Sequence, residues 1–482
     1  MKQPLFIINV LLLIAIFFLK PSYLSSNINA SFISTILIIV LVAIFNHFII
    51  LKGGNSARFD SFFILGFFVV NFQWSMMIAF SGIDLSVISR FFEKSNYMNY
   101  STWLAGLTIL VWLLSFQLTY LVLRTSRKSS GDIAFSMDYE SNKLRRDYII
   151  SRWCIWLAII FLFLFILSVG PAFLSGVYRG TANWEGPSAY IYTLMHSFCL
   201  LSLGLYIYVR SCEKEVPVGI LKFALQTPKL YLIFFCSYAL FFLMLGDRGP
   251  AISLVLLALV FYGSFISNVS APKLLVIAMV GLLVVMIIGK GRNSGGNVIS
   301  SGIENTQVDS AYDATMELAT SARTVLYSIE DVEKNGTTNG QTMINNLLGV
   351  IPLSQMIFLK LFDMQPMDIS SSTYLTYRVK GRFDKGGVGT SYIADLYLSF
   401  GLLGVILMTM FHGWYCSLIT YFLKKNKSTI KVILFIALAS SSVYLARDAF
   451  LGPLRPSIWL LVIYFFLYLT YNSIYSRKRS LQ

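Results

Sequence analysis

The sequence predicts an all-α polytopic membrane protein with about 12 transmembrane helices. The chain has 482 residues, of which 56% are hydrophobic and only 13% charged, with a mean hydropathy of +0.69. A soluble domain carries about 25% charged residues, so this chain has too few to build a water-facing surface. The apolar residues also come in long runs, and a helix needs about 20 of them to cross ~30 Å of hydrocarbon. These observations exclude a soluble globular fold.

Twelve apolar runs are expected to cross the membrane. The first has no small-residue cleavage site after it, so we interpret it as a retained span and not as a signal peptide. The run at 393–423 is too long for a vertical crossing, so part of it should tilt or project. The twelve runs are Leu5–Leu19, Phe32–Leu51, Phe62–Phe80, Trp103–Val122, Trp153–Val169, Ala189–Val209, Tyr231–Leu245, Ala251–Ile266, Leu274–Ile288, Ile393–Leu423, Val432–Leu445 and Ile458–Tyr471.

The positions of Lys and Arg predict the orientation. If the spans alternate, the basic clusters after the fourth, sixth, tenth and last spans all fall on one side, which is the cytoplasmic side. Both termini are then inside. The net charge of +15 therefore reflects membrane topology, and no nucleic-acid partner is expected. The clusters lie at 124–152, 210–229, 424–431 and 477–479.

One long connection divides the chain. Residues 1–289 should form nine helices with short loops, 290–392 an extracytoplasmic loop, and 393–482 three more helices with a basic cytoplasmic tail. The loop should cap the outer face. It contains two expected amphipathic helices, Ala311–Glu330 and Met343–Leu361, and it closes with a Gly-rich turn, Lys385–Gly389.

Several arginines lie in outer-face loops, against the usual charge bias. The arginine fork binds phosphate in bidentate geometry and stays charged near a low dielectric, so converging arginines would suit a diphosphate. The alternative is that each is a structural ion pair at a helix end, such as Arg248 with Asp247 or Arg447 with Asp448. The candidate diphosphate- or glycan-binding residues are Arg179, Arg248, Arg292, Arg378, Arg382, Arg447, Tyr178 and Tyr392.

Carboxylates at the outer face are candidates for general-base work, because a base must deprotonate an attacking hydroxyl group. The candidates are Asp395, Asp247 and Asp448. His412 is not a candidate, because it follows Ser391 by about 20 residues, or ~30 Å along a continuous helix. No Cys/His spacing or Asp-x-Asp pair indicates a metal site, and no cofactor is expected.

Three segments resemble the Wzy-type oligosaccharide repeat-unit polymerases of O-antigen and capsule synthesis. The stretch from Gly387 to Tyr397, followed by Phe400-Gly401-Leu402-Leu403-Gly404, resembles the end of their large outer loop. The turn Gly246-Asp247-Arg248-Gly249 resembles their Gly-x-Arg-Gly/Ala turn. Ala446-Arg447-Asp448 resembles the Ala-Arg-acidic element before their last span. The three segments occur in the order, and on the side, that the family requires.

The resemblance implies a fold and an activity. The fold would be a GT-C-like helix bundle in the bacterial inner membrane, with its active site facing the periplasm. The activity would be a metal-independent glycosyltransferase that polymerises undecaprenyl-diphosphate-linked oligosaccharide repeat units. Such an enzyme transfers the growing glycan onto the next lipid-linked unit and releases undecaprenyl diphosphate. Its expected partners are the lipid-linked donor and acceptor and the bilayer; a chain-length regulator and a flippase are candidate partners.

Three other functions stay open from the sequence. A lipid-linked oligosaccharide flippase would need charges at mid-membrane depth, and these spans hold almost none. An O-antigen ligase would share donor and fold, but in that family the base is commonly a His, and the outer loop contains none. A non-enzymatic assembly protein is the third alternative.

Overall fold

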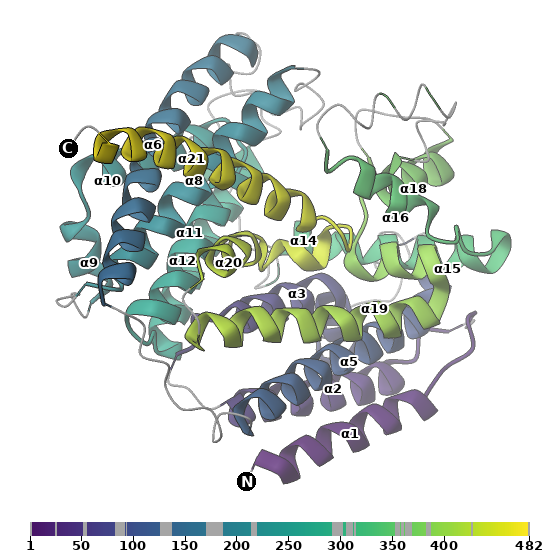
Figure 1. The fold of residues 1–482 in the computed structure, drawn as a ribbon. Helices are drawn as coiled ribbons and strands as arrows, with labels where there is room; N and C mark the ends of the chain where they lie inside the picture. Colours follow the sequence, from purple (N-terminus) through teal and green to yellow (C-terminus); the bar gives the residue numbers. More distant parts are fainter. Residues whose placement is uncertain are drawn as a thin grey trace.

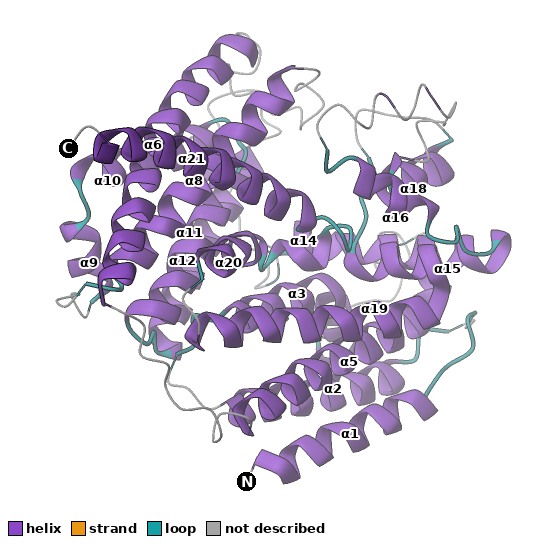
Figure 2. Cartoon of the chain, viewed as in Figure 1, coloured by secondary structure: helices purple, strands orange, loops and turns teal. Residues whose placement is uncertain are grey.

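A computed structural model shows that the described chain is built from helices, with no strand among the described residues (Figures 1 and 2). The all-α prediction is therefore confirmed. The structure describes every residue except 1, 25–26, 52–54, 82–91, 93, 126–136, 170–186, 214–218, 292–301, 305–311, 313–314, 352–356, 358–360, 362–368, 382–386, 426–427 and 481–482.

Each expected span overlaps an apolar helix. Nine helices in the described chain are long and apolar enough to cross a membrane, and the bent pair α9 (Ile220–Gln226) and α10 (Lys229–Met244) makes up to ten. Two shorter apolar helices are α1 (Lys2–Phe18) and α20 (Thr429–Ser441). The polytopic prediction is confirmed, whereas the number of crossings stays a prediction. The nine are α2 (Ala30–Leu51), α3 (Phe59–Phe80), α5 (Met98–Thr125), α6 (Met137–Val169), α8 (Pro187–Arg210), α11 (Gly249–Phe261) with the π-helical turn η4 (Tyr262–Ile266), α12 (Ala271–Gly291), α19 (Tyr392–Lys425) and α21 (Leu454–Ser480).

The helices pack in two groups. In one, α1, α2, α5 and α19 lie side by side with α3; in the other, α6 and α8 pack with α11, α20 and α21 (Figure 1). The 3₁₀ turn η7 (Tyr444–Arg447) packs against α3. Its approach depends on Gly66, because a Cβ there would lie 2.3 Å from the carbonyl oxygen of Val443. This glycine therefore helps to fix the position of the Arg447 segment.

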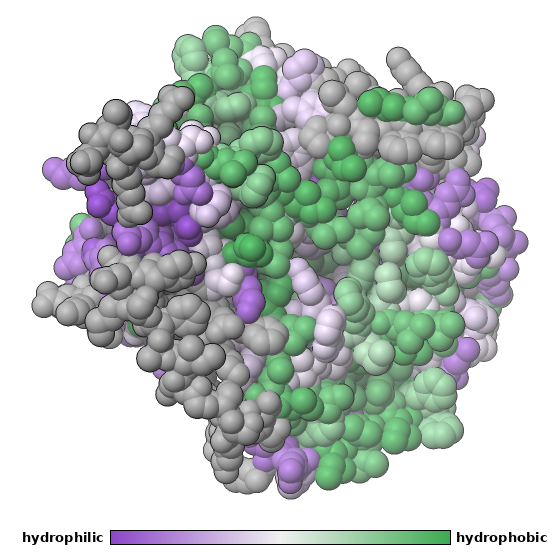
Figure 3. Space-filling model, viewed as in Figure 1, coloured by the Kyte–Doolittle hydropathy of each residue, from purple (hydrophilic) through white to green (hydrophobic). Residues whose placement is uncertain are grey.

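The two ends of the molecule differ. Both chain termini lie on the side away from α15, α16 and α18 (Figure 1). A broad hydrophobic region lies between the hydrophilic patches at the two ends (Figure 3). This arrangement is what a bundle inserted across a membrane requires, because apolar side chains must face the hydrocarbon. Which end faces the cytoplasm stays a prediction from the Lys and Arg pattern.

Short helices cover the end opposite the termini. The first loop helix was expected at 311–330. The helical region found there lies about five residues later, since it begins at Met316 and ends at Asn335. The second, 343–361, begins as α16, and much of its remainder lies outside the described residues. α18 was not predicted, although Ser370 caps it and Gly381 ends it at φ 67°. The helices are α14 (Met316–Ala319), η5 (Thr320–Ala322), α15 (Arg323–Asn335), α16 (Gln341–Leu348) and α18 (Ser371–Lys380).

Acidic residues of α15 attach this cap to its neighbours. Lys94 Nζ lies 2.8 Å from Glu330 Oε1, and the Tyr97 hydroxyl group donates to Glu333 at 2.7 Å. Asp331 accepts a hydrogen bond from the Tyr374 hydroxyl group of α18 at 3.0 Å. Charged and polar contacts thus help to hold the cap, beside the buried apolar residues of α15.

The long run at 393–423 forms α19, which breaks at Gly401. The backbone there has φ 63° and ψ −154°, a conformation that is essentially restricted to glycine. The break leaves the carbonyl groups of Leu398 and Ser399 without their usual helical donors. The N–H groups of Thr338 and Gly340 donate to them instead, at 2.9 and 3.0 Å.

The expected ~30 Å separation of His412 from the start of this helix is wrong. His412 Nδ1 lies 3.2 Å from the hydroxyl oxygen of Tyr392, and the two rings are in contact with centroids 5.4 Å apart. The estimate assumed one continuous helix, whereas the break at Gly401 folds the first two turns back toward the second part.

Gly401→Ala should lower the thermal unfolding midpoint of the purified protein in detergent. An alanine forced into this backbone region costs on the order of 1–3 kcal/mol. Gly281→Ala in α12 is the matched control, because a Cβ there meets no atom within 4 Å. That variant should keep its midpoint or gain slightly, since alanine is the better helix former. Equal midpoints for the two variants would contradict this account of the break.

Candidate functional site

Two arginines that are far apart in the sequence meet at one carboxylate. Arg248 Nη2 pairs with Glu317 Oε2, and Arg447 Nη1 lies 3.9 Å from Glu317 Oε1. The Arg248 side chain is only 10% exposed, whereas those of Arg447 and Glu317 are 37% and 45% exposed. We call these three residues the arginine–glutamate site. The site thus brings two guanidinium groups to one carboxylate.

The start of α11 positions Arg248. Asp247 Oδ1 accepts a hydrogen bond from the Gly249 N–H group at 3.1 Å, which closes the turn, and Pro250 begins the helix. Arg248 lies against the end of α12, where a Cβ on Gly289 would lie 3.2 Å from its Nη1 atom. Asp247 therefore has a structural contact, but with the Gly249 N–H group, whereas the ion pair of Arg248 is with Glu317.

The segment after η7 positions Arg447 and Asp448 beside a second carboxylate. Asp448 Oδ1 accepts from the N–H group of Ala449 at 2.8 Å, and Asp395 Oδ2 accepts from that of Phe450 at 2.9 Å. Asp395 is 1% exposed, and its Oδ1 atom has no hydrogen-bond partner among the described residues. These bonds fix the chain that follows Arg447.

Asp448 differs from Asp395 in that the residue as a whole is exposed. Even so, the surrounding protein raises its pKa to about 6, mainly by desolvation. The hydrogen bond from Ala449 lowers this pKa, and the neighbouring Asp395 raises it. A carboxylate with a pKa near 6 is ionised at neutral pH and can still accept a proton.

Other predicted site residues do not join this group in the described structure. Arg378 Nε lies 3.3 Å from Asp331 Oδ1 and donates to the Tyr374 hydroxyl group at 3.1 Å, so it belongs to the attachment of the cap. Tyr392 is 1% exposed and directs its hydroxyl group at His412. Arg179, Tyr178, Arg292 and Arg382 lie outside the described residues.

Sequence reasoning missed Glu317. It lies in the four-residue helix α14, inside the stretch that was expected to be an ordinary amphipathic helix. No local motif marks it. The only available signal was that a nearly buried arginine needs an anion, and the sequence does not say which carboxylate supplies it.

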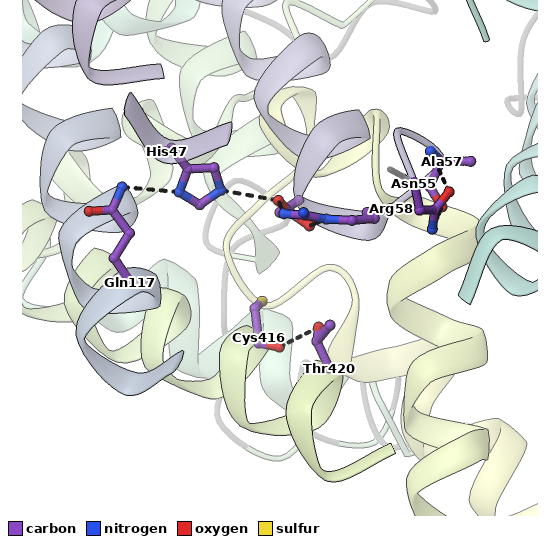
Figure 4. Close-up of polar contacts among 8 residues, drawn as sticks. His47, Asn55, Ala57, Arg58, Gln117, Cys416 and Thr420 are labelled. Atoms are coloured by element: carbon purple, nitrogen blue, oxygen red, sulfur yellow. Dashed lines mark hydrogen bonds and ion pairs between the residues drawn. The ribbon is translucent and has the colours of Figure 1, made fainter. Parts of the chain in front are cut away.

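A second polar cluster crosses the helices at the other end of α2 and α3. His47 Nε2 lies 3.0 Å from Asp60 Oδ2, Arg58 Nε donates to Asp60 at 2.9 Å, and Gln117 Nε2 lies 3.2 Å from His47 Nδ1 (Figure 4). A cavity of about 190 Å³ borders Arg58 and Asp60. Because each of these polar groups has a partner, the cluster can join α2, α3 and α5 without a buried unpaired charge.

A comparison with protein families gives one match. The model of the family described as O-antigen polysaccharide polymerase Wzy matches residues 6–479, which is nearly the whole chain. No curated protein and no solved structure matches this chain. Within the described chain, no cluster of three or more His, Cys, Asp or Glu side chains is arranged to hold a metal ion.

Glu317→Gln should strengthen the binding of inorganic pyrophosphate to the purified protein, because the arginines lose a competing anion. Charge-assisted hydrogen bonds contribute about 1.5–3 kcal/mol, so we expect roughly tenfold or greater tightening, measured as thermal stabilisation against pyrophosphate concentration. Glu304→Gln is the control, because Glu304 is an exposed residue of the same loop. An equal effect of the two substitutions would mean that Glu317 does not compete for the anion site.

Proposed function

We propose that this chain, which belongs to the O-antigen polysaccharide polymerase Wzy family, uses the arginine–glutamate site and Asp448 to join lipid-linked repeat units. Family membership and the membrane-length helices make it a multi-pass membrane polymerase of O-antigen repeat units. The proposal adds the donor, an undecaprenyl-diphosphate-linked oligosaccharide, and the role of each residue.

The convergence of Arg248 and Arg447 on Glu317 carries the proposal. A diphosphate offers more negative charge than one carboxylate, and its oxygens can accept from both guanidinium groups at once. The donor diphosphate would therefore displace Glu317 from between the arginines. Since Glu317 is half exposed and lies on a short helix, its side chain can turn toward water.

The reaction follows from this placement. A hydroxyl group of the acceptor sugar attacks the anomeric carbon of the donor and forms the new glycosidic bond. The bond between that carbon and the diphosphate oxygen breaks, and its electron pair leaves with the lipid diphosphate. Arg248 and Arg447 stabilise the negative charge that develops there, which is where preorganised donors accelerate a reaction most.

Asp448 is the base that we propose for the acceptor hydroxyl group. It follows Arg447 directly, it is an exposed residue, and its pKa of about 6 leaves it ionised at neutral pH. Asp395 is the weaker candidate, because it is buried and bound to the Phe450 N–H group. Asp247 is also weaker, because its Oδ1 atom holds the turn at the start of α11.

The Lys and Arg pattern would place this site outside the cytoplasm, at the periplasmic face of the inner membrane. The cap formed by α15, α16 and α18 lies at the end away from both termini (Figure 1), which supports this orientation. A ligase or a flippase stays an alternative. Cells without this polymerase should carry surface glycans of one repeat unit, whereas loss of a flippase should stop export.

Arg248→Ala and Arg447→Ala should each shorten the surface polysaccharide toward single repeat units. Removal of one preorganised donor at a developing anion costs about 10²–10³ in rate. Glycan length is read on gels, after checking that each variant reaches the membrane at normal abundance. Arg455→Ala is the matched control, since Arg455 is exposed near the same loop and should leave chain length unchanged. Normal chains in both Arg248 and Arg447 variants would refute the proposal.

The pH dependence of kcat/KM should follow the ionisation of Asp448. A carboxylate base works only when ionised, so kcat/KM of the purified enzyme should fall below about pH 6, because the pKa of this group is about 6. Asp448→Asn should remove this fall at low pH, the acid limb of the pH profile, together with most of the rate. Asp448→Glu should restore part of the rate and part of the acid limb. Asp247→Asn should keep the limb. An unchanged acid limb in Asp448→Asn would transfer the role of base to another group.

A further inference from the structure

A cavity at the end of the bundle that carries both termini has the residues of a phosphate site. It has a volume of about 310 Å³ and lies where α6, α8 and the α9–α10 bend meet. Its lining includes two arginines, two tyrosines and one glutamate: Arg145 and Tyr148 of α6, Tyr206 and Arg210 of α8, and Glu213 just after α8. Nothing in the polymerase reaction uses this end of the molecule.

The two arginines differ in their hydrogen-bond and ion-pair partners. Arg210 pairs with Glu213, yet its Nε atom is buried without a hydrogen-bond partner in the described structure. Arg145 is exposed, and no described residue makes a hydrogen bond or an ion pair with it. The cavity wall therefore has a net charge of about +1 and an N–H donor of Arg210 that lacks an acceptor.

Arg146, the next residue of α6, has a structural role that Arg145 lacks. Arg146 donates to Asp147 at 3.1 and 3.2 Å and stacks over the ring of Tyr468 at 4.8 Å. Asp147 is fully buried and also accepts from Thr429 and Tyr464. Arg146 and Asp147 together thus join α6 to α20 and α21, whereas Arg145 faces the cavity and joins nothing among the described elements.

The helix beside the cavity has the character of a membrane-surface helix. α9 has seven residues and none of them is buried, and it is bent by 111° from α10. Its Leu221 and Leu225 are 73% and 71% exposed. Such apolar exposure suits a helix lying in the headgroup region, with its leucines toward the acyl chains. The cavity, which is lined by Gln226 at the end of α9, then opens at headgroup depth.

We propose that this cavity binds the phosphate of an anionic phospholipid. A phosphodiester carries one negative charge, which matches the excess charge of the wall, and it offers the oxygen acceptors that Arg145 and Arg210 lack. Basic pockets between transmembrane helices at the cytoplasmic surface are suited to anionic headgroups. The tyrosines can donate to the same phosphate or to the glycerol. Lipid and free phosphate share this chemistry, and the position at headgroup depth favours lipid.

The test counts lipids bound to the purified full-length protein by native mass spectrometry. Phosphatidylglycerol is compared with phosphatidylcholine of the same acyl chains. Wild type should retain phosphatidylglycerol, and the double variant Arg145→Gln/Arg210→Gln should bind it about tenfold or more weakly, because each arginine near the surface contributes to the attraction. Arg152→Gln is the matched control, since Arg152 is an exposed arginine of the same helix outside the cavity lining. Equal lipid retention in the double variant and the control would overturn the proposal.

Two further arms keep the result decisive. Glu213→Gln removes the anion that competes at Arg210 and should increase phosphatidylglycerol retention. This variant tests the proposal even if the double variant does not fold. Inorganic phosphate is tested by thermal shift at the same concentration as the lipid. If it stabilises wild type as strongly as phosphatidylglycerol does, the cavity is a free-phosphate site and the lipid assignment is wrong. Neither outcome depends on polymerase activity.

Discussion

A guanidinium group that is nine-tenths buried at the end of an apolar helix bundle requires an anion beside it. Arg248 meets this requirement through Glu317, and the same carboxylate attracts Arg447. Withdrawing such a charge from water costs several kcal/mol unless a partner compensates for it. If the two arginines bind the donor diphosphate, as we propose, their partner must leave when the substrate arrives. A half-exposed glutamate on a short helix satisfies both conditions, and a fully buried one would not.

Local features of the fold position the two arginines and the cap. Gly66 lets η7 approach α3 and so places Arg447. Asp247 closes the turn that directs Arg248, and the break at Gly401 connects the cap to α19 through Thr338 and Gly340. The charges of polar clusters elsewhere can be compared in the same way, by whether each has a partner. The cluster of His47, Asp60 and Arg58 is neutral overall and internally paired, whereas the proposed lipid-phosphate cavity keeps Arg145 unmatched among the described residues.

The sequence predicted the helices well, because apolar runs of about 20 residues have few alternatives in a membrane. Short motifs also singled out Arg248, Arg447 and Asp448 as candidates, and the structure brings the two arginines to one carboxylate. The sequence did not reveal Glu317, because the partner of a buried charge depends on tertiary contacts that leave no local pattern. The proximity of Tyr392 and His412 was missed for a similar reason. Glycine is common in membrane helices, so the presence of Gly401 alone did not predict a break in the helix.

The most direct measurement of the central claim is an experimentally determined structure with a polyprenyl diphosphate bound, obtained by electron cryomicroscopy. Our account predicts phosphate oxygens within about 3 Å of the guanidinium nitrogens of both Arg248 and Arg447, with the carboxylate of Glu317 displaced toward solvent. A diphosphate bound elsewhere, with both arginines still facing Glu317, would contradict the account. In that case the arginine–glutamate site would be a structural ion-pair network and the leaving group would be stabilised by other residues.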